Sequence, residues 1–124
     1  MPALYFEDLR VGQRFVSGTH LMDEEQIREF AAHFDPQPFH LDAEAAKTTL
    51  FGGLVASGWH TAAVTMRLQV QSGLPLAGGI VGAGAEVKWP SPVRPRTSGR
   101  FDSVEETWTS AKDASPIRCA ARTD

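Results

Sequence analysis

A carboxylate and an imidazole lie five residues apart in the segment Asp-Pro-Gln-Pro-Phe-His, which runs from Asp35 to His40. Pro36 and Pro38 stand between them and restrict the backbone that joins them. A stiff segment lowers the entropy cost of holding two side chains in one geometry. Such a pair can share a water molecule, take a proton from it and return a proton elsewhere. The segment therefore predicts acid–base chemistry on water.

The same spacing also fits a segment without chemistry. Asp35 would then end a helix, the two prolines would form a turn, and His40 would lie on the surface. Spacing alone favours this second interpretation. A metal site is not predicted, because the four histidines show no tight ligand spacing and the chain has one thiol. His60 is expected to be a packed or capping residue.

A helix is predicted just before the pair. Asp23 is a suitable N-cap, and Gln26 follows three residues later. Pro36 is expected to stop the helix, and residues 35–42 then form a rigid loop. Asp42 is predicted to cap a short helix at residues 43–49. The apolar residues of the first helix recur at helical spacing and predict one buried stripe, formed by Ile27, Phe30, Ala31 and Phe34.

A second long helix is predicted at residues 57–72, with apolar side chains on nearly all sides, as in a central helix. Residues 79–89 alternate between apolar and other residues, which predicts a strand. The small residues of this strand are expected to let the helix approach closely. One stripe of the helix consists of Trp59, Ala62, Ala63, Met66 and Val70, and the first four of these are expected to be buried against the strand.

Further strands are predicted at residues 14–17 and 19–22 near the N-terminus, and at 100–109 and 116–122 near the C-terminus. The resulting order is strand, helices, one long apolar helix and several strands. It predicts a single α+β domain over residues 1–124, in which a helix packs on an antiparallel sheet.

The segment from Asp35 to His40 resembles the hydratase motif of the MaoC-like dehydratases and (R)-specific enoyl-CoA hydratases: Asp, any residue, Asn, Pro, an apolar residue, His. Residues 51–58, Phe-Gly-Gly-Leu-Val-Ala-Ser-Gly, are similar to the segment that leads into the central helix of that family. Residues 89–95, Trp-Pro-Ser-Pro-Val-Arg-Pro, are similar to its loop after the next long strand. Several positions differ from the family pattern. Gln37 replaces Asn, Leu54 replaces a common Arg, Ser57 replaces a frequent His, Ala63 replaces the Ser of some small hydratases, and Arg96-Thr97 follow where relatives continue with Gly-Asp.

The resemblance implies a hot-dog fold, an antiparallel β-sheet wrapped around a long central α-helix. Few apolar residues follow Arg100, which leaves open that the C-terminal strands are truncated. The implied activity is reversible hydration of a trans-2-enoyl thioester. Asp35 would be the principal base for water, and His40 would share that water and handle the second proton. The backbone N–H of Gly58 would bind the thioester oxygen.

The resemblance also implies which residues bind the substrate, which group carries it and how many copies of the chain assemble. The substrate would be carried by CoA or an acyl carrier, with no further cofactor, and the chain would form a homodimer or a dimer of dimers. Two alternatives stay open: a non-catalytic hot-dog subunit that binds acyl thioesters, and a hot-dog thioesterase. The implied substrate-binding residues are Gln37, Phe39, Gly53, Ser57 and Trp59.

Composition narrows the class of partners. The net charge is -3 and the pI is about 5.8, whereas nucleic-acid-binding domains usually carry a basic excess. Cys119 is the only cysteine, so an intrachain disulfide is impossible and a reducing compartment is favoured. The N-terminal segment contains acids and no long apolar run, which argues against a signal peptide. We therefore expect a cytoplasmic protein that binds neither membrane nor nucleic acid.

Overall fold

The structure is a computed structural model that describes residues 3–10, 13–73, 75–79, 87–89, 91–107 and 118–121. The chain divides into two compact units. One, here called the motif unit, consists of His20–Val64 and Val87–Gly99 and contains the segment from Asp35 to His40. The other, the sheet unit, consists of Met1–Thr19, Thr65–Glu86 and Arg100–Asp124.

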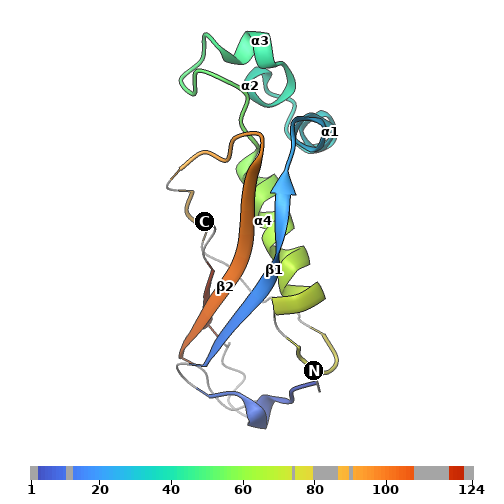
Figure 1. The fold of residues 1–124 in the computed structure, drawn as a ribbon, viewed down its shortest axis with the longest axis vertical. Coiled ribbons are helices and arrows are strands. Elements are labelled where there is room, and N and C mark those ends of the chain that lie inside the picture. Colours follow the sequence, from blue (N-terminus) through green and yellow to red (C-terminus); the bar gives the residue numbers. More distant parts are fainter. Residues whose placement is uncertain are drawn as a thin grey trace. The chain divides into compact units, whose positions relative to one another are not determined.

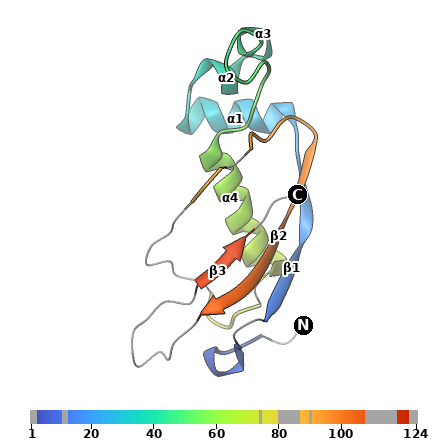
Figure 2. The ribbon, with the colours of Figure 1, turned by 90° about the vertical axis from the view of Figure 1, so that its left-hand side faces the viewer.

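Three strands form one sheet in the order β1-β2-β3 (Figures 1 and 2). β1 (Arg14–Met22) confirms that the strand predicted at residues 14–17 continues after Gly18 through residues 19–22. β2 (Thr97–Thr107) begins earlier than predicted, and β3 (Arg118–Ala121) confirms a short last strand. β2 and β3 pair antiparallel, with a register shift between Glu105 and Thr107. A short 3-10 helix, η1 (Phe6–Asp8), precedes the sheet.

Most of the strand predicted at residues 79–89 lies outside the described residues. Its last three residues, 87–89, are described and are not in a strand. The predicted packing of the long helix on this strand is therefore untested at Ala83 and Ala85.

α1 (Glu24–Phe34) begins as predicted, because the carboxylate of Asp23 accepts the N–H of Gln26 at 2.9 Å. Ile27 and Ala31 are fully buried, which confirms the centre of the predicted stripe. Phe34 is 74% exposed, so its predicted burial is wrong. It is the last residue of the helix, and its ring lies on that of Phe30, 5.1 Å away, on the surface of the helix itself.

The rigid loop predicted at residues 35–42 is partly wrong, since Pro38–Leu41 form a short helix, α2. Proline suits the first turn of a helix, where its missing N–H would have no intrahelical partner. Asp42 caps α3 (Ala43–Ala46) as predicted, because its carboxylate accepts the N–H of Glu44 at 2.9 Å. The helix ends before Thr49, the predicted last residue.

The predicted long helix is confirmed as α4 (Gly58–Leu68), which continues into a π-helical turn, η2 (Gln69–Gly73). Its predicted buried face is wrong: Trp59 is 62% and Met66 41% exposed. Ala63 and Val70 are also exposed, and Ala62 is half-buried. A helix that is apolar on nearly all sides offers more than one stripe at helical spacing. The stripe that is buried instead consists of His60, half-buried Val64 and Leu68.

The core of the motif unit joins the end of β1, α1, α3 and the segment before α4. Nearby, Arg96 has a left-handed backbone conformation, with φ of 70°, and its N–H donates to the carbonyl of Met22 at 2.6 Å. In the described residues, no helix is both long and apolar enough to span a bilayer. The core consists of Met22, Ile27, Ala46, Leu54 and Ala56, with Phe39, Ala43, Val64 and Val93 packed against it.

Candidate active site

The C-terminal end of α1 positions Asp35. Its backbone N–H donates to the carbonyl of Ala31 at 2.9 Å, which makes Asp35 the C-cap of the helix. The following proline disfavours a helical conformation at Asp35, so the chain leaves the helix here. The side chain of Asp35 is 19% exposed, so its carboxylate is mostly shielded from water.

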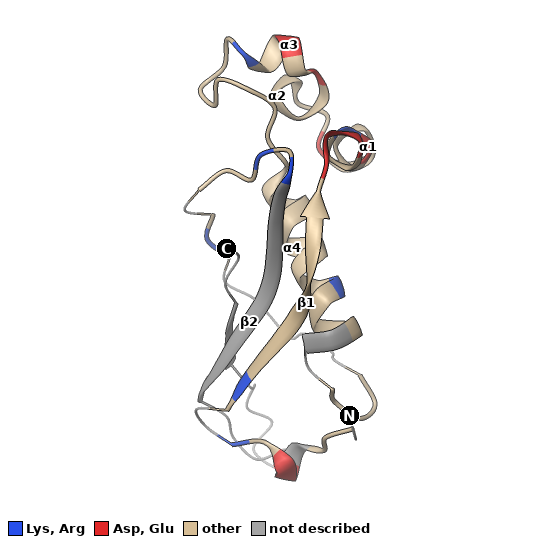
Figure 3. Ribbon diagram, viewed as in Figure 1, with Lys and Arg blue, Asp and Glu red and all other residues tan. Residues whose placement is uncertain are grey.

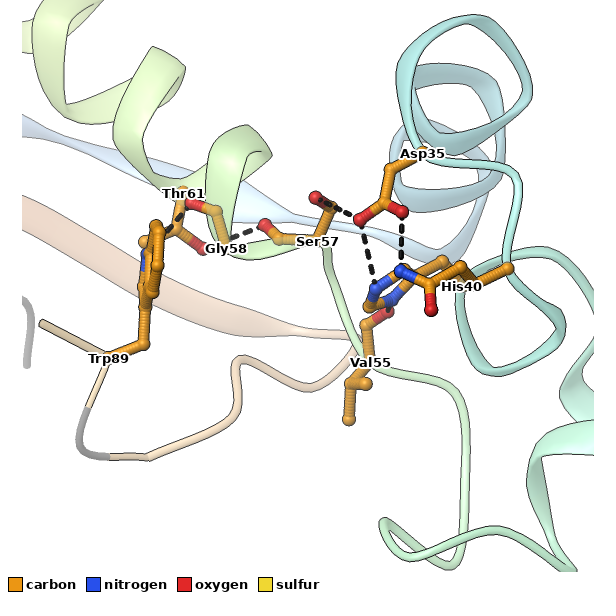
Figure 4. A network of polar contacts seen from close by, with 8 residues as sticks. Asp35, His40, Val55, Ser57, Gly58, Thr61 and Trp89 are labelled. Carbon is orange, nitrogen blue, oxygen red and sulfur yellow. Dashed lines mark hydrogen bonds and ion pairs between the residues drawn. The ribbon is translucent and has the colours of Figure 1, made fainter. Parts of the chain in front are cut away.

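His40 lies in α2 and is only 5% exposed, so the alternative of a surface histidine is wrong. Its Nδ1 lies 2.6 Å from the carbonyl oxygen of Val55. A carbonyl can only accept, so Nδ1 must carry a proton. In the neutral ring, Nε2 is then the unprotonated nitrogen. Nε2 lies 3.3 Å from Oδ2 of Asp35, and the two groups face one another in Figure 4.

Ser57 and Gln37 hold the carboxylate of Asp35. Ser57, which is fully buried, donates its hydroxyl proton to Oδ2 at 2.7 Å. Gln37 donates its side-chain N–H to Oδ1 at 2.6 Å. The hydrogen bond from Ser57, then that from Gln37 and the charge of His40, lower the pKa of Asp35, and burial opposes them only in part. Asp35 is therefore ionised at neutral pH.

Backbone hydrogen bonds fix the segment that carries Val55 and Ser57. The N–H of Val55 donates to the carbonyl of Phe39 at 3.0 Å, and that of Ala56 donates to Val93 at 2.8 Å. The ring of Phe39 meets the His40 ring edge-on, with centroids 4.6 Å apart. Phe39 thus supports His40 from the core and belongs to the packing around the site.

Gly58 is the first residue of α4, directly after Ser57. The N–H of Thr61 donates to the carbonyl of Ser57 at 3.1 Å, so the first hydrogen bond of the helix starts there. The N–H of Gly58 consequently has no partner within the helix, and it lies at the positive end of the helix dipole. Such an N–H suits an oxygen on which negative charge develops.

Trp89 lies against Gly58 on the side away from Asp35 and His40 (Figure 4). Its indole N–H donates to the carbonyl of Gly58 at 2.9 Å. A Cβ added at Gly58 would lie 2.6 Å from the indole ring. Close approach of this ring requires glycine at position 58, independently of any role of its N–H.

Two residues of the predicted substrate-binding set lie elsewhere in the motif unit. Gly53 is next to Arg94, whose guanidinium is 3.6 Å from the position of a Cβ added there. Trp59 is exposed, and its ring packs edge-on against that of Trp89 at 5.2 Å. The structure thus gathers Asp35, Gln37, His40 and Ser57 into one network, with Gly58 adjoining it.

Sequence reasoning missed two parts of the site. The carbonyl of Val55 selects the tautomer of His40. Every residue has a backbone carbonyl, so the type of residue at position 55 does not indicate this contact. Trp89 was predicted only as the end of a strand and the start of a loop, although it lies against the glycine expected to be the oxyanion donor. Ser57 was predicted to bind substrate, whereas the structure places its hydroxyl on Asp35.

A separate hollow of about 270 Å³ lies beside α1 and His60. His60 is 7% exposed, and its ring stacks on Phe30 with centroids 4.6 Å apart, which confirms it as a packed histidine. Burial, and to a smaller extent His20, lower the pKa of His60. The hollow is lined by Gln26, Glu29, Phe30, His33, Phe34 and His60.

Comparison with known proteins places this geometry in a family. Residues 9–116 match the family described as MaoC like domain. The MaoC-like dehydratase from Rhodospirillum rubrum is 52% identical, with a TM-score of 0.92 over 98% of this chain and 85% of that one. The unliganded (R)-hydratase PhaJ1 from Pseudomonas aeruginosa is 26% identical, with a TM-score of 0.75 over 94% of this chain and 72% of that one.

A relative in Bacillus subtilis (strain 168), the uncharacterised protein YdeM, is 32% identical over 89 residues. That stretch covers 72% of this chain and 62% of YdeM. The two structural relatives support the hot-dog fold class and a family of hydratase or dehydratase type. Because the family match extends over most of its length, this chain belongs to the MaoC-like dehydratase family.

Proposed function

We propose that this chain is a hydro-lyase that adds water reversibly to a trans-2-enoyl thioester, as an enoyl-CoA hydratase or 3-hydroxyacyl-CoA dehydratase. One observation carries the proposal: a buried imidazole with a fixed tautomer presents Nε2 to the carboxylate of Asp35 at 3.3 Å. Membership of the MaoC-like dehydratase family and the likeness to an (R)-hydratase support it.

In the hydration direction, a water molecule donates its hydrogens to Asp35 and to Nε2 of His40. Asp35 takes one proton as the water oxygen bonds to the β-carbon of the substrate. The electron pair of the double bond moves toward the thioester oxygen, which the N–H of Gly58 stabilises. The proton passes from Oδ2 to Nε2, because imidazole is a stronger base than a carboxylate. His40 then delivers it to the α-carbon, so that H and OH are added and both residues return to their starting states.

The proposed partners follow from the thioester. The acyl group is carried by CoA or an acyl carrier protein, with no other cofactor, and the role is in fatty acid metabolism in the cytoplasm. We also propose that the sheet wraps around α4 in the hot-dog manner and that the chain forms a homodimer or a dimer of dimers. Hot-dog proteins are typically oligomeric, and the exposed apolar side chains of Met66 in α4 and Val70 in η2 support this assembly.

Hydration of crotonyl-CoA, followed as loss of the enoyl thioester absorbance, tests the activity. Asp35→Asn and His40→Ala should each lower turnover by roughly 10²–10⁴. Matched controls are Glu44→Gln and His33→Ala, which change the same groups at exposed positions. Near-normal turnover in both Asp35→Asn and His40→Ala would contradict the assignment.

Measuring free thiol and the 3-hydroxyacyl product beside the absorbance separates the alternatives. A thioesterase would release the free thiol of CoA from crotonyl-CoA without forming the 3-hydroxyacyl product. A non-catalytic subunit would bind crotonyl-CoA and leave its absorbance at the background rate. Either result would replace the hydro-lyase as the function of the chain.

A further inference from the structure

We infer that Trp89 is a specificity-determining residue that binds the sulfur-side arm of the thioester, the pantetheine chain, beside Gly58. The inference rests on the proposed function, since it uses the position of a thioester carbonyl at the N–H of Gly58. Trp89 would then bind the carrier part of the substrate, which lies on the other side of the thioester carbonyl from the acyl chain.

Contacts along the start of α4 define two sides of the site. On one side, Ser57 binds the carboxylate of Asp35, and His40 faces the same oxygen. On the other side, the indole of Trp89 lies against the α-carbon and carbonyl of Gly58. Figure 4 shows the same order, with Trp89 and the acid–base pair at opposite ends of the network.

The chemistry of the substrate assigns these two sides. A thioester carbonyl carbon bears two substituents, the unsaturated acyl group and the sulfur. Hydration occurs on the acyl group, so that group must extend toward Asp35 and His40. With the carbonyl oxygen at Gly58, the sulfur and its pantetheine arm then extend toward Trp89.

The side chains on that side suit such an arm. Trp89 is 45% and Trp59 62% exposed, and their rings pack edge-on at 5.2 Å, which forms an accessible aromatic wall. Aromatic faces bind a largely apolar chain, and the amide groups of pantetheine can stack on them. The wall is accessible without any movement of the core.

The loop that carries Trp89 also has the charge that a CoA carrier needs. Residues 87–99 contain three basic residues and no Asp or Glu. The described residues 87–89 and 91–96 are drawn in tan and blue in Figure 3. The three, Lys88, Arg94 and Arg96, are all exposed. Guanidinium and ammonium groups bind phosphates, so the loop can bind the phosphate end of the arm as well.

Kinetics with shortened carriers tests the inference. Trp89→Ala should raise KM for crotonyl-CoA and crotonyl-pantetheine on the order of tenfold, the change that corresponds to about 1.4 kcal/mol. KM for crotonyl-N-acetylcysteamine, which lacks most of the arm, should change less. Trp89→Phe keeps a ring but loses the N–H donor, and it should restore most of the affinity. Equal effects of both variants on kcat, with KM unchanged for every carrier, would show a structural role and overturn the inference.

A binding measurement keeps the test independent of catalysis and of the folding of Trp89→Ala. The variant Trp59→Phe/Trp108→Phe leaves Trp89 as the single tryptophan. Its emission should change saturably with butyryl-CoA, which cannot be hydrated, and should stay constant with butyrate. Constant emission with butyryl-CoA would overturn the inference.

The two proposals can fail separately. If the wild type hydrates crotonyl-CoA and KM does not depend on Trp89, the hydro-lyase stands and the role of Trp89 fails. If the wild type does not hydrate crotonyl-CoA and the emission of Trp89 responds to butyryl-CoA, the reaction fails and the thioester-arm site stands.

Discussion

The buried hydroxyl of Ser57 donates to Oδ2 of Asp35 at 2.7 Å, and the same oxygen lies 3.3 Å from Nε2 of His40. One carboxylate oxygen therefore receives a fixed donor and also faces the imidazole. The hydrogen bond from Ser57 lowers the pKa of Asp35 and fixes the orientation of its carboxylate. Ser57 acts through Asp35 and is a positioning residue.

Ser57→Ala should raise the pKa of Asp35, because it removes the largest contribution that lowers this pKa. The pKa should rise because the hydrogen bond from Ser57 stabilises only the ionised form of the Asp35 carboxyl group. Activity should then be lost at a higher pH on the acid side than in the wild type. The measurement is the carboxyl titration of Asp35 by NMR, combined with the pH dependence of crotonyl-CoA hydration. Thr48→Ala, which removes a hydroxyl from an exposed position, is the control and should leave both curves in place.

Gly58→Ala should destabilise the protein by about 1–3 kcal/mol, the usual cost of overpacking. The new Cβ would lie 2.6 Å from the indole of Trp89, so the ring or the start of α4 must move. Movement of the helix start displaces the Gly58 N–H, and hydration should fall on the order of 10²-fold. Thermal unfolding and the crotonyl-CoA rate measure the two effects.

Two variants check the origin of this effect. Gly53→Ala should keep the wild-type melting temperature, because its Cβ would make only an ordinary contact of 3.6 Å with Arg94. Trp89→Leu combined with Gly58→Ala should recover part of the lost stability, since the smaller side chain leaves room for the methyl group. No recovery in the double variant would show that another contact opposes a side chain at position 58.

The stability of the fold should fall as the pH decreases through about 6.5, the ordinary pKa of histidine. His60 has a lowered pKa in the folded protein, so the unfolded chain binds its proton more readily. The loss of stability caused by His60 is absent above the pKa of this histidine in the unfolded chain. It grows as the pH falls, and it becomes constant below the pKa of His60 in the folded protein. Urea denaturation at a series of pH values measures the slope. His60→Leu should flatten it, whereas the exposed His33→Leu should not.

The proposed dimer gives a further test. Val70 is 61% and Met66 41% exposed on one helical segment, an apolar surface that soluble proteins usually cover. Sedimentation at micromolar concentration should show a dimer or larger assembly for the wild type. Met66→Asp or Val70→Asp should shift it toward the monomer, and Gln71→Asp, at an exposed polar position, should not. A wild-type monomer would refute the assembly.

Residue types and spacing predicted the parts of the site that depend on local chemistry. Asp23 and Asp42 were recognised as helix caps because short carboxylates accept the free N–H groups of a first turn. Spacing alone favoured a turn without chemistry at Asp35 and His40, and the resemblance to the hydratase motif singled them out as a pair. The structure confirms that they face one another.

Contacts between distant segments could not be predicted in the same way. Ser57 is 22 residues from Asp35, and Trp89 is 31 residues from Gly58, so no local pattern connects them. Burial of α4 was assigned to the wrong face for a related reason. Periodicity gives the spacing of a stripe, and the neighbouring elements decide which stripe is covered.

Arg96 has φ of 70° immediately before β2, in the left-handed region that a side chain with a Cβ rarely adopts. The hydrogen bond of its N–H to the carbonyl of Met22 helps to hold this conformation. Glycine adopts this conformation without the steric cost of about 1–2 kcal/mol that other residues have. Arg96→Gly should therefore give a more heat-resistant protein, at the loss of one positive charge from the segment of residues 87–99 that also carries Trp89.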